Sequence, residues 1–149
     1  MLKLSRKTLL ALEAVIDIAF NARPEPVQAK EITARQGVPQ RYLEQVMQQL
    51  VRAGILKGVR GPRGGYRLAR ERRRISVGDI VRVAETVEDE NGDDGKPRSE
   101  LGARIVTPLI HSLQNEVMQR LDAITIEDLC RRARTEGVEG GTVAADFTI

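Results

Sequence analysis

The segment Gly58-Val-Arg-Gly-Pro-Arg-Gly-Gly-Tyr-Arg-Leu68 decides the fold of this chain. Its glycines and proline predict a turn between two short strands, 55–57 and 66–68. Arg60 and Arg63 fall at the tip of this hairpin. A basic, glycine-rich hairpin is typical of the wing of a DNA-binding domain, where cations meet the phosphate backbone or the minor groove.

Two helices are predicted directly before the hairpin, at 27–36 and 39–53. Gly37 ends the first helix, and Pro39 opens the second, a helix-turn-helix arrangement. In the second helix an inward stripe is expected at Leu43, Val46, Met47 and Leu50. The opposite face carries Arg41, Glu44, Gln45, Gln48 and Arg52. Hydrogen-bonding side chains of this kind suit base edges in a major groove. An ordinary solvated face would look the same, but the basic hairpin that follows favours a recognition helix.

The glycines of the hairpin have a second expected role. Gly61, Gly64 and Gly65 are expected to supply positive φ angles and a close approach to the duplex. The segment lacks the Gly-Lys-Ser/Thr ending of a phosphate-binding P-loop, so nucleotide binding is not expected.

The other predicted elements are helical. A first helix, 5–21, has Ser5 as its cap, and a fourth, 77–86, has Ser76 as its cap. The apolar face of the first helix is predicted to be Leu9, Leu12, Val15, Ile16, Ala19 and Phe20. In the predicted helix at 27–36 the side chains expected to point inward are Ala29, Ile32 and Ala34. The arginines that follow the hairpin suit either phosphate attraction or a solvated turn, and they are Arg70, Arg72, Arg73 and Arg74.

A long helix is predicted from Thr107, as the N-cap, with Pro108 in its first turn, to about 123. Apolar residues recur at spacings of three and four, which predicts a seam between two helices. The expected dimer-interface residues are Ile110, Leu113, Val117, Leu121 and Ile124. Residues 99–106 form either a short preceding helix or a first segment kinked at Pro108, and a last helix, capped by Thr125, covers 126–134.

The predicted fold class is mainly α with a small β-wing: a winged helix-turn-helix domain plus a long C-terminal dimerisation helix. The predicted divisions are the DNA-binding domain at 1–86, an acidic linker at 87–106, the dimerisation helix with a short helix at 107–136, and a tail at 137–149.

Charge divides the chain in the same way. Residues 1–86 carry 17 Lys and Arg against 8 Asp and Glu, whereas 87–149 carry 7 against 13. The excess of Lys and Arg in residues 1–86 therefore predicts a polyanionic partner such as double-stranded DNA.

No apolar run reaches the ~18–20 residues that cross a bilayer, and no signal peptide is expected. A single cysteine fits a reducing compartment. We expect a cytoplasmic protein without membrane contact.

The chain resembles the IscR/NsrR/CymR family of bacterial winged helix-turn-helix transcription regulators over nearly its whole length. The matching segments are Tyr42-Leu43-Glu44-Gln45, Ala53-Gly54-Ile55, Val59-Arg60-Gly61-Pro62, Gly64-Gly65-Tyr66-Arg67-Leu68-Ala69, Ile75-Ser-Val-Gly-Asp-Ile80 and Ile124-Thr-Ile-Glu-Asp-Leu129. The resemblance implies a homodimer on a roughly palindromic operator, with the long helices crossed or paired.

By position, the resemblance implies Gln28 at a phosphate, Arg60 in the minor groove and Tyr66 packed on the wing strand. It also implies a major-groove set, Gln40, Arg41, Tyr42, Glu44 and Gln45. With the residues predicted from the helix face and the hairpin tip, the DNA-binding set is Gln28, Gln40, Arg41, Tyr42, Glu44, Gln45, Gln48, Arg60 and Arg63.

One departure separates the chain from the family's iron–sulfur sensors. These usually place three cysteines between the fourth helix and the long helix, whereas 88–106 here holds no cysteine and no histidine. Cys130 and His111 cannot replace three thiolates. The chain thus resembles the cysteine-poor branch, alongside the cysteine-metabolism repressor type, with no cofactor or metal and with a partner protein or small molecule as effector.

Two alternatives remain open. One is an iron–sulfur, metal or redox sensor with unusual ligands, such as carboxylates of the acidic loop or residues from across the dimer. The other is a winged-helix adaptor that binds a protein. An enzyme is not expected, because no nucleophile–base pair is evident.

Overall fold

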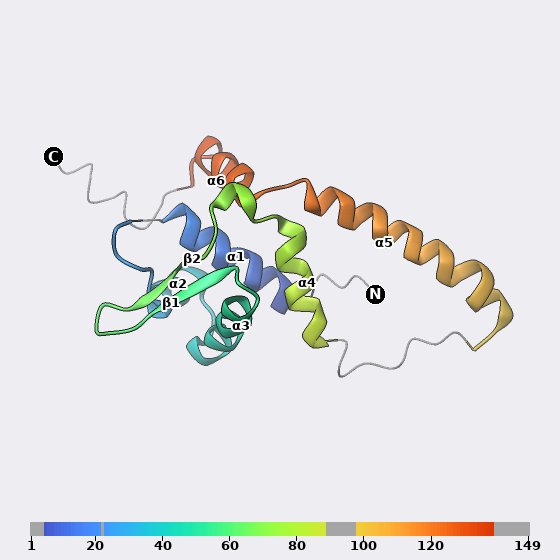
Figure 1. Cartoon of the computed structure of the whole chain (residues 1–149), viewed down its shortest axis with the longest axis horizontal. Helices are drawn as coiled ribbons and strands as arrows, with labels where there is room; N and C mark the ends of the chain where they lie inside the picture. Colours follow the sequence, from blue (N-terminus) through green and yellow to red (C-terminus); the bar gives the residue numbers. More distant parts are fainter. Residues whose placement is uncertain (1–4, 22, 89–97, 139–149) are drawn as a thin grey trace.

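The computed structural model describes residues 5–21, 23–88 and 98–138. It is mostly helical, with one two-stranded antiparallel sheet (Figure 1). In chain order the elements are α1 (Arg6–Phe20), α2 (Ala29–Gln36), α3 (Gln40–Arg52), β1 (Leu56–Val59), β2 (Gly65–Leu68), the 3₁₀ turn η1 (Arg72–Arg74), α4 (Val77–Glu88), the π-helical turn η3 (Gly102–Val106), α5 (Thr107–Asp122) and α6 (Ile126–Thr135). The expected winged helix-turn-helix is confirmed.

The helices begin where local capping predicts. The Ser5 hydroxyl accepts from the Thr8 N–H, and Ser76 and Asp79 exchange the two hydrogen bonds of a capping box. Thr125 caps α6 in the same way. Gly37 ends α2 with a φ of 67°, a left-handed conformation that favours glycine. The hydrogen bonds at Ser5, Ser76 and Thr125 satisfy N–H groups that the start of a helix leaves unpaired.

α1 is the central helix of the core, because α3, α4 and α6 all pack on it. Its buried face is rotated from the predicted one: Leu9 is 47% exposed, while Leu10, Ala11 and Ala14 are buried. The prediction was also wrong for Ala34, which is exposed, and correct for Ile32. A helix covered on several sides buries a wide surface, so the periodicity of the sequence alone does not centre that surface.

The wing is held to the domain by more than its own two strands. β1 pairs with β2 from Leu56↔Leu68 to Val59↔Gly65. Val27 and Tyr66 exchange backbone hydrogen bonds of 3.0 and 2.8 Å, so the segment before α2 adds a bridge to β2.

The predicted role of the hairpin glycines needs correction. Only Gly61 of the three has a positive φ, at 115°. At Gly64 a Cβ would overlap the Val59 carbonyl oxygen, and at Gly65 it would overlap the Val27 carbonyl oxygen. Gly64 therefore allows close packing of the backbone within the wing, and Gly65 allows close packing of the wing against the segment before α2.

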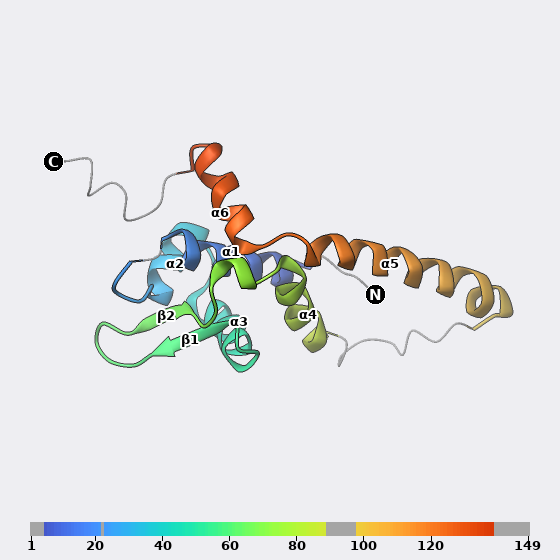
Figure 2. The ribbon, with the colours of Figure 1, turned by 45° about the horizontal axis from the view of Figure 1, so that its top comes forward.

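α5 is an arm that runs away from the winged domain, as Figures 1 and 2 both show. It has no buried residue among those described. The predicted N-cap at Thr107 is wrong, because Val106 and Thr107 are already helical and the Thr107 N–H donates to the Gly102 carbonyl. This i→i−5 bond belongs to a π turn, which accommodates Pro108 without ending the helix.

α6 returns to the core beyond the arm. Ser76 and Thr125 form an antiparallel bridge, and Ile126 and Cys130 are fully buried. α4 extends to Glu88, and helical residues precede Gly102, so the predicted linker is helical at both described ends. None of the described helices combines the length and the apolar character needed to cross a membrane.

Candidate nucleic-acid interface

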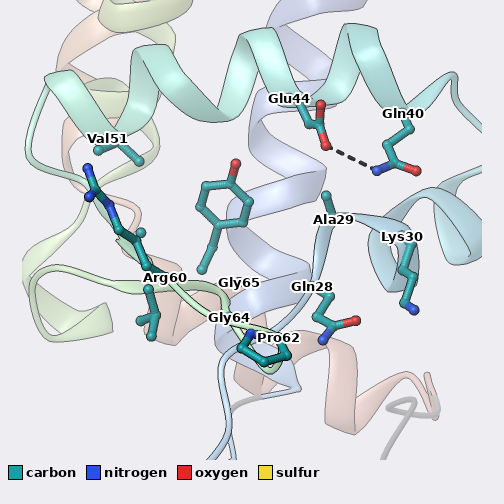
Figure 3. A pocket seen from close by; sticks show the side chains of 13 residues that line it. Gln28, Ala29, Lys30, Gln40, Glu44, Val51, Arg60, Pro62, Gly64 and Gly65 are labelled. Atoms are coloured by element: carbon teal, nitrogen blue, oxygen red, sulfur yellow. Dashed lines mark hydrogen bonds between the residues drawn. The ribbon is translucent and has the colours of Figure 1, made fainter.

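A groove of about 530 Å³ lies between the start of α2, one face of α3 and the wing (Figure 3). It brings together four of the predicted DNA-binding residues: Gln28 from the N-cap of α2, Gln40 and Glu44 from α3, and Arg60 from the hairpin. The helix-turn-helix places α2 against α3, and the bridge from Val27 to β2 places the wing opposite them.

α3 has the two faces that the sequence predicted. Leu43, Val46, Met47 and Leu50 are buried. Arg41, Gln45 and Gln48 are exposed, and they extend the polar surface beyond the groove.

Tyr42 is one of the predicted residues that do not line this groove. It is half-buried and lines a separate cavity of about 510 Å³ with Leu9, Leu10 and Val38. Arg63 is exposed at the hairpin tip but does not line the groove.

Two polar side chains on α3, Gln40 and Glu44, are hydrogen-bonded to each other. The Gln40 amide donates to a carboxylate oxygen of Glu44 over 3.0 Å, as Figure 3 shows. Burial raises the pKa of Tyr66, which lines the same groove, and the charge of Glu44 raises it further. Tyr66 is therefore a neutral phenol in this groove at neutral pH, and Glu44 is the acceptor suited to an exocyclic base amine.

The cations around the groove differ from those that follow the wing. Among the described residues no carboxylate lies within ion-pair distance of Arg41, Arg60 or Arg63. In contrast, Arg72 pairs with Glu127, and Arg73 pairs with Glu71 at 2.7 Å. The remaining two arginines of that cluster are also engaged: Arg74 lies 4.0 Å from Glu71, and Arg70 donates to the Gly54 carbonyl. Among the described residues, the arginines of α3 and the wing named above therefore keep their charge available to phosphate, whereas the arginines after the wing are engaged.

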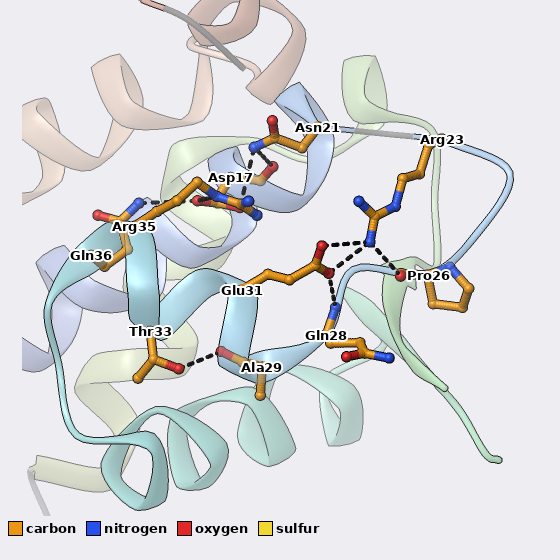
Figure 4. A network of polar contacts seen from close by, with 10 residues as sticks. All are labelled: Asp17, Asn21, Arg23, Pro26, Gln28, Ala29, Glu31, Thr33, Arg35 and Gln36. Atoms are coloured by element: carbon orange, nitrogen blue, oxygen red, sulfur yellow. Dashed lines mark hydrogen bonds and ion pairs between the residues drawn. The ribbon is translucent and has the colours of Figure 1, made fainter. Parts of the chain in front are cut away.

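A polar network holds α2 in place at both ends (Figure 4). At its start, Glu31 accepts from Arg23 at 2.8 and 2.6 Å and from the Gln28 N–H at 2.8 Å. Burial opposes ionisation of Glu31, but these hydrogen bonds outweigh it and lower its pKa.

At the other end of α2, the Asp17 carboxylate accepts from Arg35 at 2.9 and 2.6 Å and from Gln36 at 3.1 Å. The Asp17 side chain is 4% exposed. These contacts fix the helix that precedes α3, and through Gln28 they fix one wall of the groove.

Lys30 is a groove residue that the sequence reasoning missed. It is exposed in the first turn of α2, on the same wall as Gln28. Its place two residues after Gln28 was the only available signal, and that signal is weak because lysine is common on exposed helix surfaces.

The residues of the predicted dimer interface on α5 differ in their exposure. Leu113, Val117 and Ile124 are exposed, whereas Ile110 and Leu121 are half-buried. The exposed apolar side chains continue in steps of four toward the far end of the arm, through residues the prediction omitted: Leu109, Ile105 and Leu101.

The donors present do not fit a cysteine-ligated iron–sulfur cluster. Cys130 is fully buried, and burial raises the pKa of its thiol. His111 lies exposed on α5, a separate element. Within 5–21, 23–88 and 98–138 no group of three His, Cys, Asp or Glu side chains could hold a metal ion. The predicted acidic loop lies largely outside those residues.

The helix-turn-helix, the basic wing and the groove between them define a winged helix-turn-helix DNA-binding protein. Residues 4–132 match the Rrf2 family, described as an iron-dependent transcriptional regulator. The chain belongs to this family, whose members regulate transcription and are not enzymes.

Known relatives agree with this assignment. The chain is 33% identical over 140 residues to the HTH-type transcriptional regulator IscR of Photobacterium profundum, covering 93% of this chain and 81% of the relative. It is 35% identical over 129 residues to IscR of Aliivibrio salmonicida, covering 86% and 77%. The structure of T. potens IscR matches with a TM-score of 0.72 and 34% identity over 96% of both chains. The structure of CymR, the global cysteine regulator of B. subtilis, matches with a TM-score of 0.68 and 33% identity over 89% of this chain and 98% of CymR.

Proposed function

We propose that this chain is a homodimeric repressor that reads a palindromic operator through α3 and the wing and acts without a cysteine-ligated iron–sulfur cluster. The observation that carries the proposal is a hydrogen-bonding α3 face beside one groove, combined with three exposed arginines on α3 and the wing that have no ion-pair partner among the described residues: Arg41, Arg60 and Arg63.

In this proposal α3 and the wing contact different parts of the DNA. α3 enters the major groove, where the Glu44 carboxylate accepts from a cytosine amine and the amides of Gln45 and Gln48 pair with base edges. The Gln40–Glu44 hydrogen bond holds the carboxylate in place before DNA arrives. Arg60 and Arg63 reach the minor groove or its phosphates, and Gln28 meets a phosphate at the start of α2.

The arm supplies the dimer. An exposed apolar stripe that includes Leu109, Leu113 and Val117 is unpartnered within the described chain. A helix that presents such a stripe gains most by pairing with the same stripe of a second copy, because one interface then buries both. Two copies of α3 related by a two-fold axis read two inverted half-sites, which is why the operator is palindromic. A dimer across promoter DNA blocks transcription by occupying it.

The cluster-free part of the proposal rests on the donor set, one buried thiol and one exposed imidazole. The effector is then a partner protein or a small molecule. The proposal differs here from the iron dependence in the family description.

Two measurements test the proposal. The first selects duplexes from a random library with the full-length protein and measures dissociation constants for the enriched duplex and a scrambled one. We expect inverted half-sites and a preference of about 10³-fold or more. Equal binding to scrambled DNA refutes an operator-reading role and favours the protein-binding adaptor.

The second measurement purifies the protein without oxygen and records absorbance at about 300–700 nm together with iron per chain. A colourless, iron-free protein that binds the selected duplex is the expected result. Stoichiometric iron with visible absorbance refutes the cluster-free part, while leaving the DNA-reading part intact. Transcription in vitro from a promoter containing the selected duplex should fall as protein is added, and a rise refutes repression.

A further inference from the structure

We propose that Arg82, Asp122 and Gly78 form a latch that fixes the direction of the arm and thereby sets the half-site spacing that the dimer accepts. The proposal rests on the dimeric function proposed above and assigns to these residues a positioning role in it. None of the three lies in the DNA-binding groove.

The first part of the latch is a two-pronged ion pair between α4 and the last residue of α5. The Arg82 guanidinium donates to the two carboxylate oxygens of Asp122 at 2.8 and 2.6 Å. Hydrogen bonding to Arg82 lowers the pKa of Asp122, although partial burial opposes this. A bidentate arginine–carboxylate pair restricts orientation as well as distance, unlike a single-point contact.

The second part is the space left by Gly78 in the first turn of α4. A Cβ on Gly78 would overlap the Asp122 carboxylate, and the Asp122 backbone nitrogen would be 3.1 Å away. The φ of Gly78 is not positive, so the glycine is required here for space alone. The carboxylate also lies against the N-terminal turn of α4, where negative charge is favoured by the helix dipole.

The third part is a pair of backbone hydrogen bonds that join the start of α4 to the segment between α5 and α6. The Val77 N–H donates to the Ile124 carbonyl at 2.8 Å, and the Ile126 N–H donates to the Ile75 carbonyl at 2.9 Å. These bonds hold the start of α6, directly after the end of α5. α5 also packs on α4, and the ion pair at Asp122 adds an oriented polar attachment to that contact. Together the backbone bonds and the ion pair fix the direction of the arm.

The length of the arm amplifies any change at this joint. The 16 residues of α5 span about 24 Å, so a rotation of about 10° at Asp122 moves the far end by about 4 Å. One extra base pair between half-sites translates the second site by about 3.4 Å and rotates it by about 34°. A loose joint would therefore let the two copies of α3 follow a change of one base pair, whereas a fixed joint would not.

The experiment measures binding to a series of duplexes in which the selected half-sites are separated by the preferred spacer and by one base pair more or less. The variants are Asp122→Asn, Arg82→Gln and Gly78→Ala, and a charge-reversed double variant, Arg82→Asp with Asp122→Arg, tests for rescue. Arg132→Gln is the matched control, because it removes an exposed ion pair between α6 and its C-cap residue Glu136, away from the joint.

We expect the wild type and the control to lose about tenfold in affinity when the spacer changes by one base pair. The three single variants should lose about threefold or less, with unchanged affinity for a duplex carrying one half-site, and the double variant should recover part of the preference. Spacing profiles that stay like the wild type in all three single variants overturn the latch. A wild type without spacing preference refutes the dimeric operator reading instead, and the latch proposal falls with it.

A second readout is independent of DNA and of any loss in affinity. Spin labels attached through Gln48→Cys report the distance between the two copies of α3 in the dimer. A narrow wild-type distribution that broadens in Asp122→Asn supports the latch, and an unchanged width in a folded dimer overturns it.

Discussion

Replacing Arg60 by alanine should reduce the salt dependence of DNA binding by a predictable amount. Arg60 is exposed and has no ion-pair partner among the described residues, so its charge is available to one phosphate. Each neutralised phosphate of duplex DNA contributes about 0.9 to the slope of log K against log salt concentration. A homodimer loses two such contacts, so the slope should become less steep by about 1.8.

The change in slope has a direct consequence for affinity. Between about 50 and 200 mM salt, a slope difference of about 1.8 changes the ratio of wild-type to variant affinity by about 12-fold. The affinity of the variant falls furthest below that of the wild type at low salt. Fluorescence anisotropy with the selected duplex at four or more salt concentrations measures both slopes.

Arg73→Ala is the matched control for this prediction. Arg73 is also an exposed arginine near the wing, but Glu71 neutralises it at 2.7 Å. Its removal should leave the slope nearly unchanged. An unchanged slope in Arg60→Ala, or an equal reduction in both variants, would refute the argument that unpaired wing cations carry the phosphate contacts. A reduction of about 0.9 would indicate one protein copy per duplex.

Four further predictions follow from the same structure. Glu44→Ala should relax base preference more than it lowers affinity, because it removes an acceptor for a base amine; library selection with the variant checks this, and an unchanged consensus would contradict it. Leu113→Asp should give monomers in light scattering, since it places a charge in the exposed stripe, and an unchanged mass would remove that stripe from the interface. Asp17→Asn should lower the free energy of unfolding by about 1–3 kcal/mol in urea titrations, because a buried acceptor of charged hydrogen bonds is weakened; a change near zero would contradict this. The lowered pKa of Glu31 stabilises the fold above its ordinary value of 4.5, and this stability is lost as the pH falls through the lowered pKa. Glu31→Gln should therefore flatten the fall of melting temperature in that acidic range, and parallel curves for both proteins would exclude the contribution.

Much of the architecture could be predicted from short-range sequence patterns. The stripe from Leu43 to Leu50 predicts which face of α3 is buried, because residues three and four apart share one side of a helix. The caps at Ser5, Ser76 and Thr125 lie where predicted, because a cap involves only residues within one turn. The wing follows from the glycines and proline of one eleven-residue segment.

The candidate site could be predicted only in part. The polar face of α3 and the hairpin tip were identified because each lies on a single element. The sequence did not indicate that Lys30 joins their groove, that Tyr42 lies in a different cavity, or that the arginine cluster after the wing is paired. Each of these facts depends on which elements pack together, and that information is absent from local spacing.

By itself, the sequence determined the main helices, the two faces of α3, the wing and the division of charge between the two parts of the chain. Only the tertiary structure decided that Leu9 is exposed and that Arg72 is neutralised by Glu127, 55 positions further along the chain. It also decided that Gly78 makes room for Asp122, a contact across 44 positions that directs the arm. The physical reason is range: helix periodicity, capping and turns involve neighbours along the chain, whereas exposure, ion pairing and close packing are set by segments that meet only when the chain folds.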